Sequence, residues 1–217
     1  MKNNCFISVQ QARIMYNSGN EALKEIACST YTEKELVVDY KKITNFRKAC
    51  DASYLNYDEI KEKADTIYNI SKSSAAMLKL NIIRRALNLG YDMHFAKNPR
   101  NSFLYYPYTP LATIPEGCNY YKEKLNSGTF QIIGKVKIEG VKYNVLGGGV
   151  DYDVNSGLGG FNYQTGICRC RSEVSLFSCA TKEIAEHFGK YFGMLITEAK
   201  YGSIINDFEI VESKYEN

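Results

Sequence analysis

Glycine is distributed unevenly along this chain, and the distribution limits what its two parts can fold into. Of the 16 glycines among 217 residues, 14 follow residue 116, in a region that is also rich in tyrosine. Glycine destabilises helix interiors and favours turns, bulges and close approaches of the backbone. The sequence therefore predicts a helical first part and a second part built from strands and bends, with the change near residue 90.

The first ninety residues contain repeated helix-start signals. Ser8-x-x-Gln11 and Thr32-x-x-Glu35 match the capping box, and Asn56-x-x-Glu59 is a third start. In such motifs the first side chain accepts a hydrogen bond from a backbone N–H at the helix N-terminus, and the later side chain reaches back. We expect consecutive short helices here.

Between Lys72 and Leu89 the apolar pattern becomes broad. Apolar residues occupy roughly two thirds of the helical circle at 100° per residue, and Gly90 follows as a typical left-handed stop. This pattern predicts a largely buried central helix, which connects the helical part to the rest of the chain.

After Gly90, short runs of β-branched and aromatic residues alternate with glycine. Residues 131–138 and 141–146 flank Glu139-Gly140, which is a hairpin signal, and further strands are expected at 91–95, 103–108 and 174–178. A closing helix begins near Thr181. We therefore expect an α+β fold with a helical N-terminal module (residues 1–70), followed by a central helix, a small, mainly antiparallel sheet and a C-terminal helix (residues 71–217).

Two glycines interrupt the closing helix. Gly189 and Gly193 lie about one turn apart, beside an apolar face that runs from Ile184 to Ala199. Each costs about 1 kcal/mol of helix stability relative to alanine. Close contact with another backbone compensates such a cost, and that backbone belongs either to the sheet of the same chain or to a partner subunit.

One loop has the spacing of a hard-cation site. Asp151, Asp153 and Asn155 place three oxygen-bearing side chains at alternate positions before Gly157, which suits the many oxygen ligands of calcium. The loop departs from the EF-hand pattern at its sixth and twelfth positions, and its flanking segments are expected to be strands. The same residues are also typical of a turn that needs no metal.

Catalytic and cofactor-binding patterns do not occur in the sequence. The glycine tracts match neither the phosphate-binding loop nor the dinucleotide fingerprint, and neither histidine, His94 or His187, accompanies a nucleophile motif. We expect structural histidines, no catalytic residues and no cofactor. Three tyrosines, Tyr105, Tyr106 and Tyr108, form an aromatic cluster in the sequence. Such a cluster suits either core packing or a protein contact surface.

The charge is nearly balanced, with 27 Lys and Arg against 24 Asp and Glu and a net charge of +3. This balance disfavours nucleic acid as a partner, because domains that bind it are usually strongly basic. The sequence offers neither the ~20 consecutive apolar residues of a membrane helix nor the apolar stretch of a signal peptide. We expect no membrane partner and no secretion by a signal peptide.

Six segments of the chain have sequence patterns found in other proteins. These segments are residues 6–36, 74–90, 105–108, 133–135, 145–148 and 179–192. Through these segments, which extend over most of the chain, it resembles uncharacterised small proteins encoded by Bacteroidetes phages and mobile elements, including crAss-like phages. The resemblance implies a phage origin and a place in the virion or the host cytoplasm. It implies no particular activity.

Together these observations favour a non-enzymatic phage protein that acts through protein–protein contacts, as a virion structural or accessory component. Its partners would be other phage proteins or a second copy of itself. The alternative is an intracellular host-takeover or anti-defence factor that binds a bacterial protein or a nucleotide signal. The residues that we expect to make such contacts are Tyr105, Tyr106, Tyr108, Gly189 and Gly193.

Overall fold

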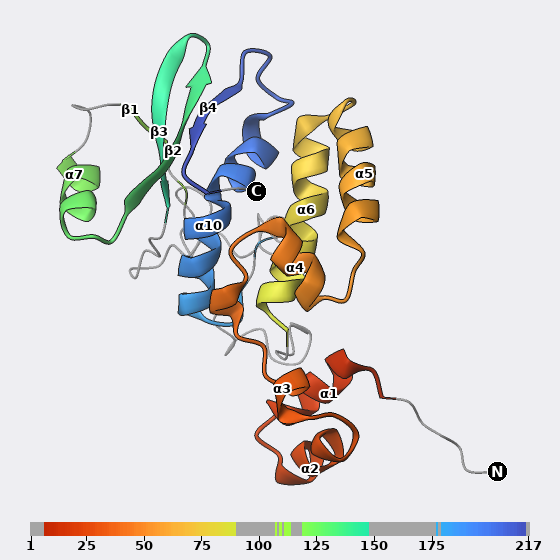
Figure 1. Ribbon diagram of the computed structural model, residues 1–217. Coiled ribbons are helices and arrows are strands. Elements are labelled where there is room, and N and C mark those ends of the chain that lie inside the picture. Colours follow the sequence, from red (N-terminus) through yellow and green to blue (C-terminus); the bar gives the residue numbers. More distant parts are fainter. Residues whose placement is uncertain are drawn as a thin grey trace, which may run out of the picture. The chain divides into compact units, whose positions relative to one another are not determined.

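The computed structural model describes residues 7–89, 107, 109, 111–113, 119–147, 177 and 179–215. Within these ranges the chain is α+β: helices come first, and a four-stranded antiparallel sheet packs against a long C-terminal helix (Figure 1). This fold class is the one expected from the sequence. The chain forms two compact units, which are described separately below. In the described ranges the first unit contains residues 7–40 with 88 and 89, and the second contains the other residues.

The described part of the first unit contains three short helices, α1 (Val9–Tyr16), α2 (Glu21–Thr30) and α3 (Glu33–Leu36). Both predicted capping boxes form. The Gln11 N–H donates to Ser8 Oγ at 3.2 Å, and the Thr32 N–H donates to the Glu35 carboxylate at 2.9 Å. The helices enclose a small cluster of buried side chains, Ala12, Ala27 and Leu36.

A 3-10 turn, η1 (Tyr40–Lys42), spans the division between the units. The helices of the second unit that follow it are α4 (Phe46–Ala52), α5 (Tyr57–Tyr68) and α6 (Lys72–Leu87). Asn56 caps α5 as predicted, because its Oδ1 accepts a hydrogen bond from the Asp58 N–H at 3.1 Å. The expected central helix is confirmed as α6. It is largely buried, through Ala75, Ala76, Leu80, Ile83, Ala86 and Leu87.

The boundary between the units differs from the expected boundary at residue 70. Helices α4 and α5 pack on α6, so they belong to the unit that contains the sheet, and α1–α3 belong to the first unit. The apolar stripe of a helix shows which of its sides is covered. It does not show which neighbour covers that side, and this is why the sequence did not locate the boundary.

The described sheet has the strand order β1-β3-β2-β4, and every neighbouring pair is antiparallel. Its strands are β1 (Leu111–Thr113), β2 (Gln131–Ile138), β3 (Val141–Gly147) and β4 (Glu209–Ser213), and helix α7 (Asn119–Asn126) precedes β2. The predicted hairpin is confirmed in β2 and β3. Its turn residues, Glu139 and Gly140, have φ angles of 50° and 82°, which are typical of the type I′ turn that matches strand twist.

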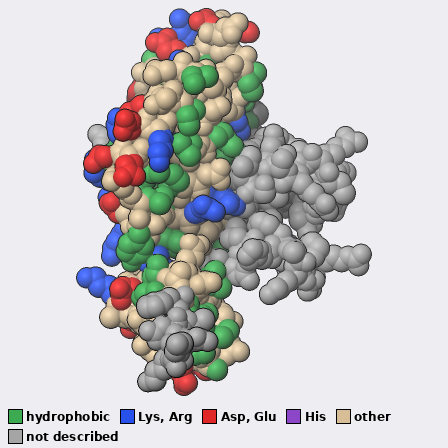
Figure 2. All heavy atoms as spheres, turned by 90° about the vertical axis from the view of Figure 1, so that its right-hand side faces the viewer, with side chains coloured by type: hydrophobic (Ala, Val, Ile, Leu, Met, Phe, Trp, Pro, Cys, Tyr) green, Lys and Arg blue, Asp and Glu red, His purple; other side chains and the backbone are tan. Residues whose placement is uncertain are grey.

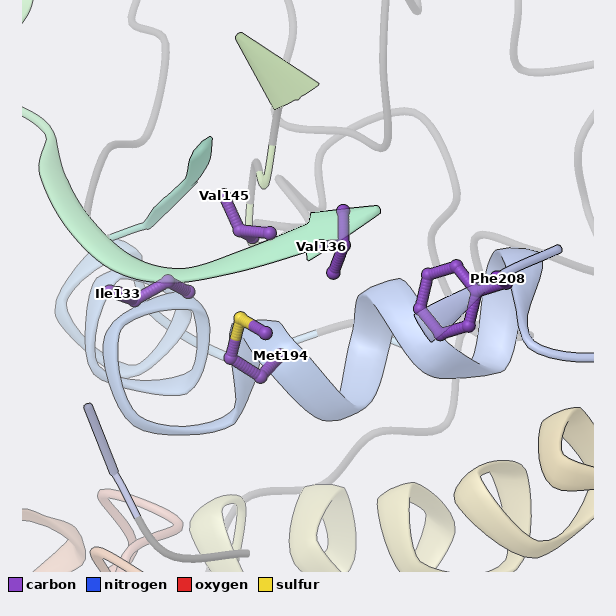
Figure 3. Close-up of a cluster of buried hydrophobic side chains, with 5 residues drawn as sticks. All are labelled: Ile133, Val136, Val145, Met194 and Phe208. Atoms are coloured by element: carbon purple, nitrogen blue, oxygen red, sulfur yellow. The ribbon is translucent and has the colours of Figure 1, made fainter. Parts of the chain in front are cut away.

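Helix α10 (Lys182–Tyr201) contacts β2 and β3 on one side and α6 on another (Figure 1). Thr181 caps it as expected, accepting a hydrogen bond from the Ile184 N–H at 3.3 Å. Figure 3 shows the sheet side of this helix, where buried side chains from the strands point toward Met194. The cluster consists of Ile133, Val136, Val145, Met194 and Phe208. None of the helices in the described ranges combines the length and apolar character that crossing a bilayer requires.

Candidate functional site

Most candidate residues from the sequence lie outside the described residues, namely Asp151, Asp153, Asn155, Tyr105, Tyr106, Tyr108 and His94. Gly189, Gly193 and His187 are described. Across the described ranges, no three His, Cys, Asp or Glu side chains are grouped so that they could hold a metal ion.

Gly189 and Gly193 are buried where α10 meets the sheet. A Cβ on Gly193 would touch Ile133 Cδ1 and lie 2.9 Å from Thr109 Cγ2. The Gly189 carbonyl oxygen lies 2.5 Å from the place that a Cβ on Gly147 would take. The close contact that offsets the cost of these two helix glycines is therefore made with the sheet of the same chain.

His187 connects α10 to the segment before α4. Its Nε2 lies 2.8 Å from the carbonyl oxygen of Ile43, and its ring centroid lies 4.6 Å from that of Tyr191. Because a carbonyl oxygen only accepts hydrogen bonds, this contact places a proton on Nε2. The ring therefore links α10 to the backbone before α4.

The surface of the second unit carries two unusually exposed isoleucines. Ile70 is 86% exposed and Ile204 is 78% exposed, and no other large hydrophobic side chain in the described ranges is exposed to this degree. Tyr68, two residues before Ile70, is 41% exposed. We call Tyr68, Ile70 and Ile204 the apolar patch. Figure 2 views the chain from the side on which α5 lies in Figure 1, and hydrophobic side chains are visible there between separate basic and acidic groups.

Three serines bring the two distant segments of the apolar patch together. Ser71 Oγ and Ser203 Oγ are 3.0 Å apart, the Ser73 N–H donates to Ser203 Oγ at 3.0 Å, and the Ser203 N–H donates to Ser73 Oγ at 2.9 Å. We call these residues the serine cluster. Ile70 directly precedes Ser71 and Ile204 directly follows Ser203, so the hydrogen bonds hold both isoleucines at the same end of the unit.

Local sequence explains why the two segments meet here. Ser71 is positioned at the start of α6, where its Oγ accepts a hydrogen bond from the Ser74 N–H at 3.2 Å. Gly202 follows α10, and its N–H donates to the Glu198 carbonyl at 2.8 Å. A Cβ on Gly202 would lie 2.6 Å from the Glu198 carbonyl oxygen and 3.2 Å from Lys72 Cβ. A glycine is therefore needed where the end of α10 approaches the start of α6.

A buried carboxyl group lies beside the serine cluster. Glu198, on the last turn of α10, is 9% exposed. Burial raises the pKa of its carboxyl above the ordinary value, and this effect exceeds the opposite effects of Lys79, Lys72 and a hydrogen bond with Tyr68. The site therefore combines an exposed apolar patch with an ionisable group beneath it.

No motif in the sequence predicted this site. A single isoleucine in the short polar connection between α5 and α6 is the signal that points to Ile70. Ile204 carries no such signal, because Ile205 follows it directly in the connection between α10 and β4. Their proximity depends on the serine hydrogen bonds, which no local pattern predicts.

Comparisons with protein-family models, with curated proteins and with solved structures found no match. The candidate site is therefore defined by its own residues: the apolar patch, the serine cluster and Glu198.

Proposed function

We propose that this chain is a non-enzymatic phage protein that binds another protein through the apolar patch. One observation carries the proposal: Ile70 and Ile204, 86% and 78% exposed, are held at one place by hydrogen bonds between segments far apart in the sequence. Burying one such side chain is worth about 1.5–3 kcal/mol. A partner that covers both isoleucines would gain this energy from each of them.

The surroundings of the apolar patch suit a protein interface. Interfaces commonly place apolar and aromatic anchors at their centre and polar groups at their rim. Here the Tyr68 ring supplies the aromatic anchor, and the Lys72 ammonium lies 5.9 Å from its centroid. The serine hydroxyls and Lys72 supply polar groups around the two isoleucines.

Variants of the apolar patch test this binding role. In cells infected with a phage that encodes this chain, cross-linking followed by mass spectrometry should identify a partner of the wild-type protein. The double variant Ile70→Ser/Ile204→Ser should lose that partner. Val141→Ser is the matched control, because Val141 is also exposed but lies on β3. Equal recovery of the partner by all three proteins would contradict the proposal.

We also propose that the chain is a virion structural or accessory component, which follows from the resemblance of its sequence to phage proteins. Mass spectrometry of purified virions should then detect it. A chain that is abundant in infected cells but missing from purified particles would overturn the virion role. A cross-linked partner encoded by the host would favour a host-directed factor instead.

A further inference from the structure

Glu198 is connected to both parts of the candidate site. Tyr68 from α5 and Lys72 and Lys79 from α6 lie near enough to its carboxyl to lower the pKa of that group, against the larger effect of burial. Its backbone carbonyl accepts hydrogen bonds from Ser73 Oγ at 3.3 Å and from the Gly202 N–H at 2.8 Å. Glu198 therefore bonds to the serine cluster through its main chain, while its buried side chain lies near Tyr68 of the apolar patch.

The protonation state of this carboxyl changes the energy of the closed arrangement. A neutral carboxyl needs only a hydrogen-bond partner when it is buried, whereas a carboxylate loses far more hydration energy. Lys72, Lys79 and Tyr68 favour the charged form but do not offset the burial. An ionised Glu198 would regain hydration if the end of α10 moved away from the connection between α5 and α6.

We propose that deprotonation of Glu198 loosens the serine cluster and releases Ile70 and Ile204 from their fixed arrangement. The apolar patch is then ordered when Glu198 is protonated and mobile when it is ionised. This inference rests on the proposed function for what the change regulates, but the change itself is a property of the isolated chain.

Amide NMR of the whole chain, titrated between about pH 4 and pH 8, tests the proposal. In the wild type, the amide signals of Ser73, Ser203 and Ile204 should shift together with one midpoint above 4.5, the ordinary value for glutamate. Glu198→Gln should abolish this shared transition. Glu183→Gln is the matched control, because Glu183 lies in the first turn of the same helix and is exposed, and it should leave the transition unchanged.

A second variant separates the titration of Glu198 from general loss of structure. Tyr68→Phe removes the hydrogen bond that favours the carboxylate, so the midpoint should move to higher pH while the fold is retained. The proposal is overturned if the three amides do not titrate together, if their midpoint is the ordinary one, or if Glu198→Gln titrates like the wild type.

A third measurement keeps this inference distinct from the proposed function. Paramagnetic relaxation of the Ile70 and Ile204 methyl groups by a neutral soluble nitroxide should change with pH in the wild type and stay constant in Glu198→Gln. If these changes occur and no protein binds the apolar patch, the proposed function fails alone. If a partner binds the patch while the methyl relaxation is independent of pH, the present inference fails alone.

Discussion

Tyr54 has a backbone conformation that is rare for a bulky residue. Its φ angle is 55°, and it follows α4 at the position where glycine usually ends a helix. The Leu55 N–H donates to the Cys50 carbonyl at 2.9 Å, and the Tyr54 N–H donates to the Asp51 carbonyl at 3.1 Å. These two bonds form the Schellman motif. Tyr54 is 65% exposed.

Replacing Tyr54 with glycine should therefore raise the free energy of unfolding by about 1 kcal/mol, because glycine adopts this conformation without a clash. Chemical denaturation measures the change. Tyr54→Ala is the control, since it removes the ring but keeps the Cβ that causes the strain. An equal gain in both variants would show that the ring, and not the backbone, is responsible.

Glu198 should make the chain less stable as the pH rises, which is the opposite of what a carboxyl with a lowered pKa does. Burial raises the pKa of its carboxyl in the folded state, so the folded chain binds the proton more tightly than the unfolded chain. Its contribution to stability is then complete below the unfolded pKa and is lost as the pH rises through the folded pKa. Each tenfold difference in proton affinity corresponds to about 1.4 kcal/mol.

Glu198→Gln should remove this loss and be more stable than the wild type at neutral pH, which denaturation at several pH values will show. The pKa of Glu183 is shifted in the opposite direction from that of Glu198. A hydrogen bond to its own backbone N–H, with a further one from Thr181, lowers the pKa of its carboxyl, so its contribution is present above the unfolded pKa and is lost as the pH falls through the folded pKa. If Glu198→Gln is less stable than the wild type at neutral pH, the assigned effect of burial is wrong.

At the scale of elements, local signals predicted the helix starts and the hairpin, whereas long-range pairing stayed hidden. Thr181 and Asn56 act within a few residues of the helices they cap, and Glu139-Gly140 joins neighbouring strands. β4 was not expected, because its sequence has only two apolar residues, Ile210 and Val211, and its hydrogen-bonding partner is the distant strand β2. A strand that is exposed along its whole length leaves no alternation to detect.

The contact between α10 and the sheet requires a residue without a side chain on β3. A Cβ at Gly147 would lie 2.5 Å from the Gly189 carbonyl oxygen and 2.7 Å from Ile133 Cδ1. Because backbone atoms of a packed helix move little, Gly147→Ala should destabilise the chain by about 1–3 kcal/mol. Thermal or chemical unfolding measures this loss.

Lys142→Ala, on an exposed position of the same strand, is the control for Gly147→Ala. It should change the free energy of unfolding by no more than about 0.5 kcal/mol. A similar loss in the two variants would mean that β3 responds to any alanine, and the close approach of α10 would not be the cause.

At the scale of the whole chain, each compact unit has its own buried cluster. Ala12, Ala27 and Leu36 belong to the first unit, and the cluster around Ile133 and Met194 belongs to the second. Separate cores allow the units to respond separately to a core mutation. The sequence indicated two parts because glycine marks the change from helices to strands. Only the packing of α4 and α5 on α6 places their boundary after Tyr40.

Leu36→Ala should destabilise the first unit by about 2–5 kcal/mol through the cavity it creates. Hydrogen exchange measured by mass spectrometry should then show faster exchange in α1–α3 and unchanged protection in α10 and β2. Ile133→Ala should give the reverse pattern. Faster exchange throughout the chain in both variants would show that the two units unfold as one.

The pairing of β2 with β4 has a consequence for synthesis. About seventy residues separate the two strands, and a ribosome that adds roughly 5–20 residues per second needs several seconds to make them. Until β4 is made, the β2–β3 hairpin has one hydrogen-bonding edge open, and until α10 is made its apolar face is uncovered. Unpaired strand edges with exposed apolar side chains are prone to aggregation. The yield of folded protein in a cell therefore depends on how well the nascent hairpin is protected until the last strand arrives.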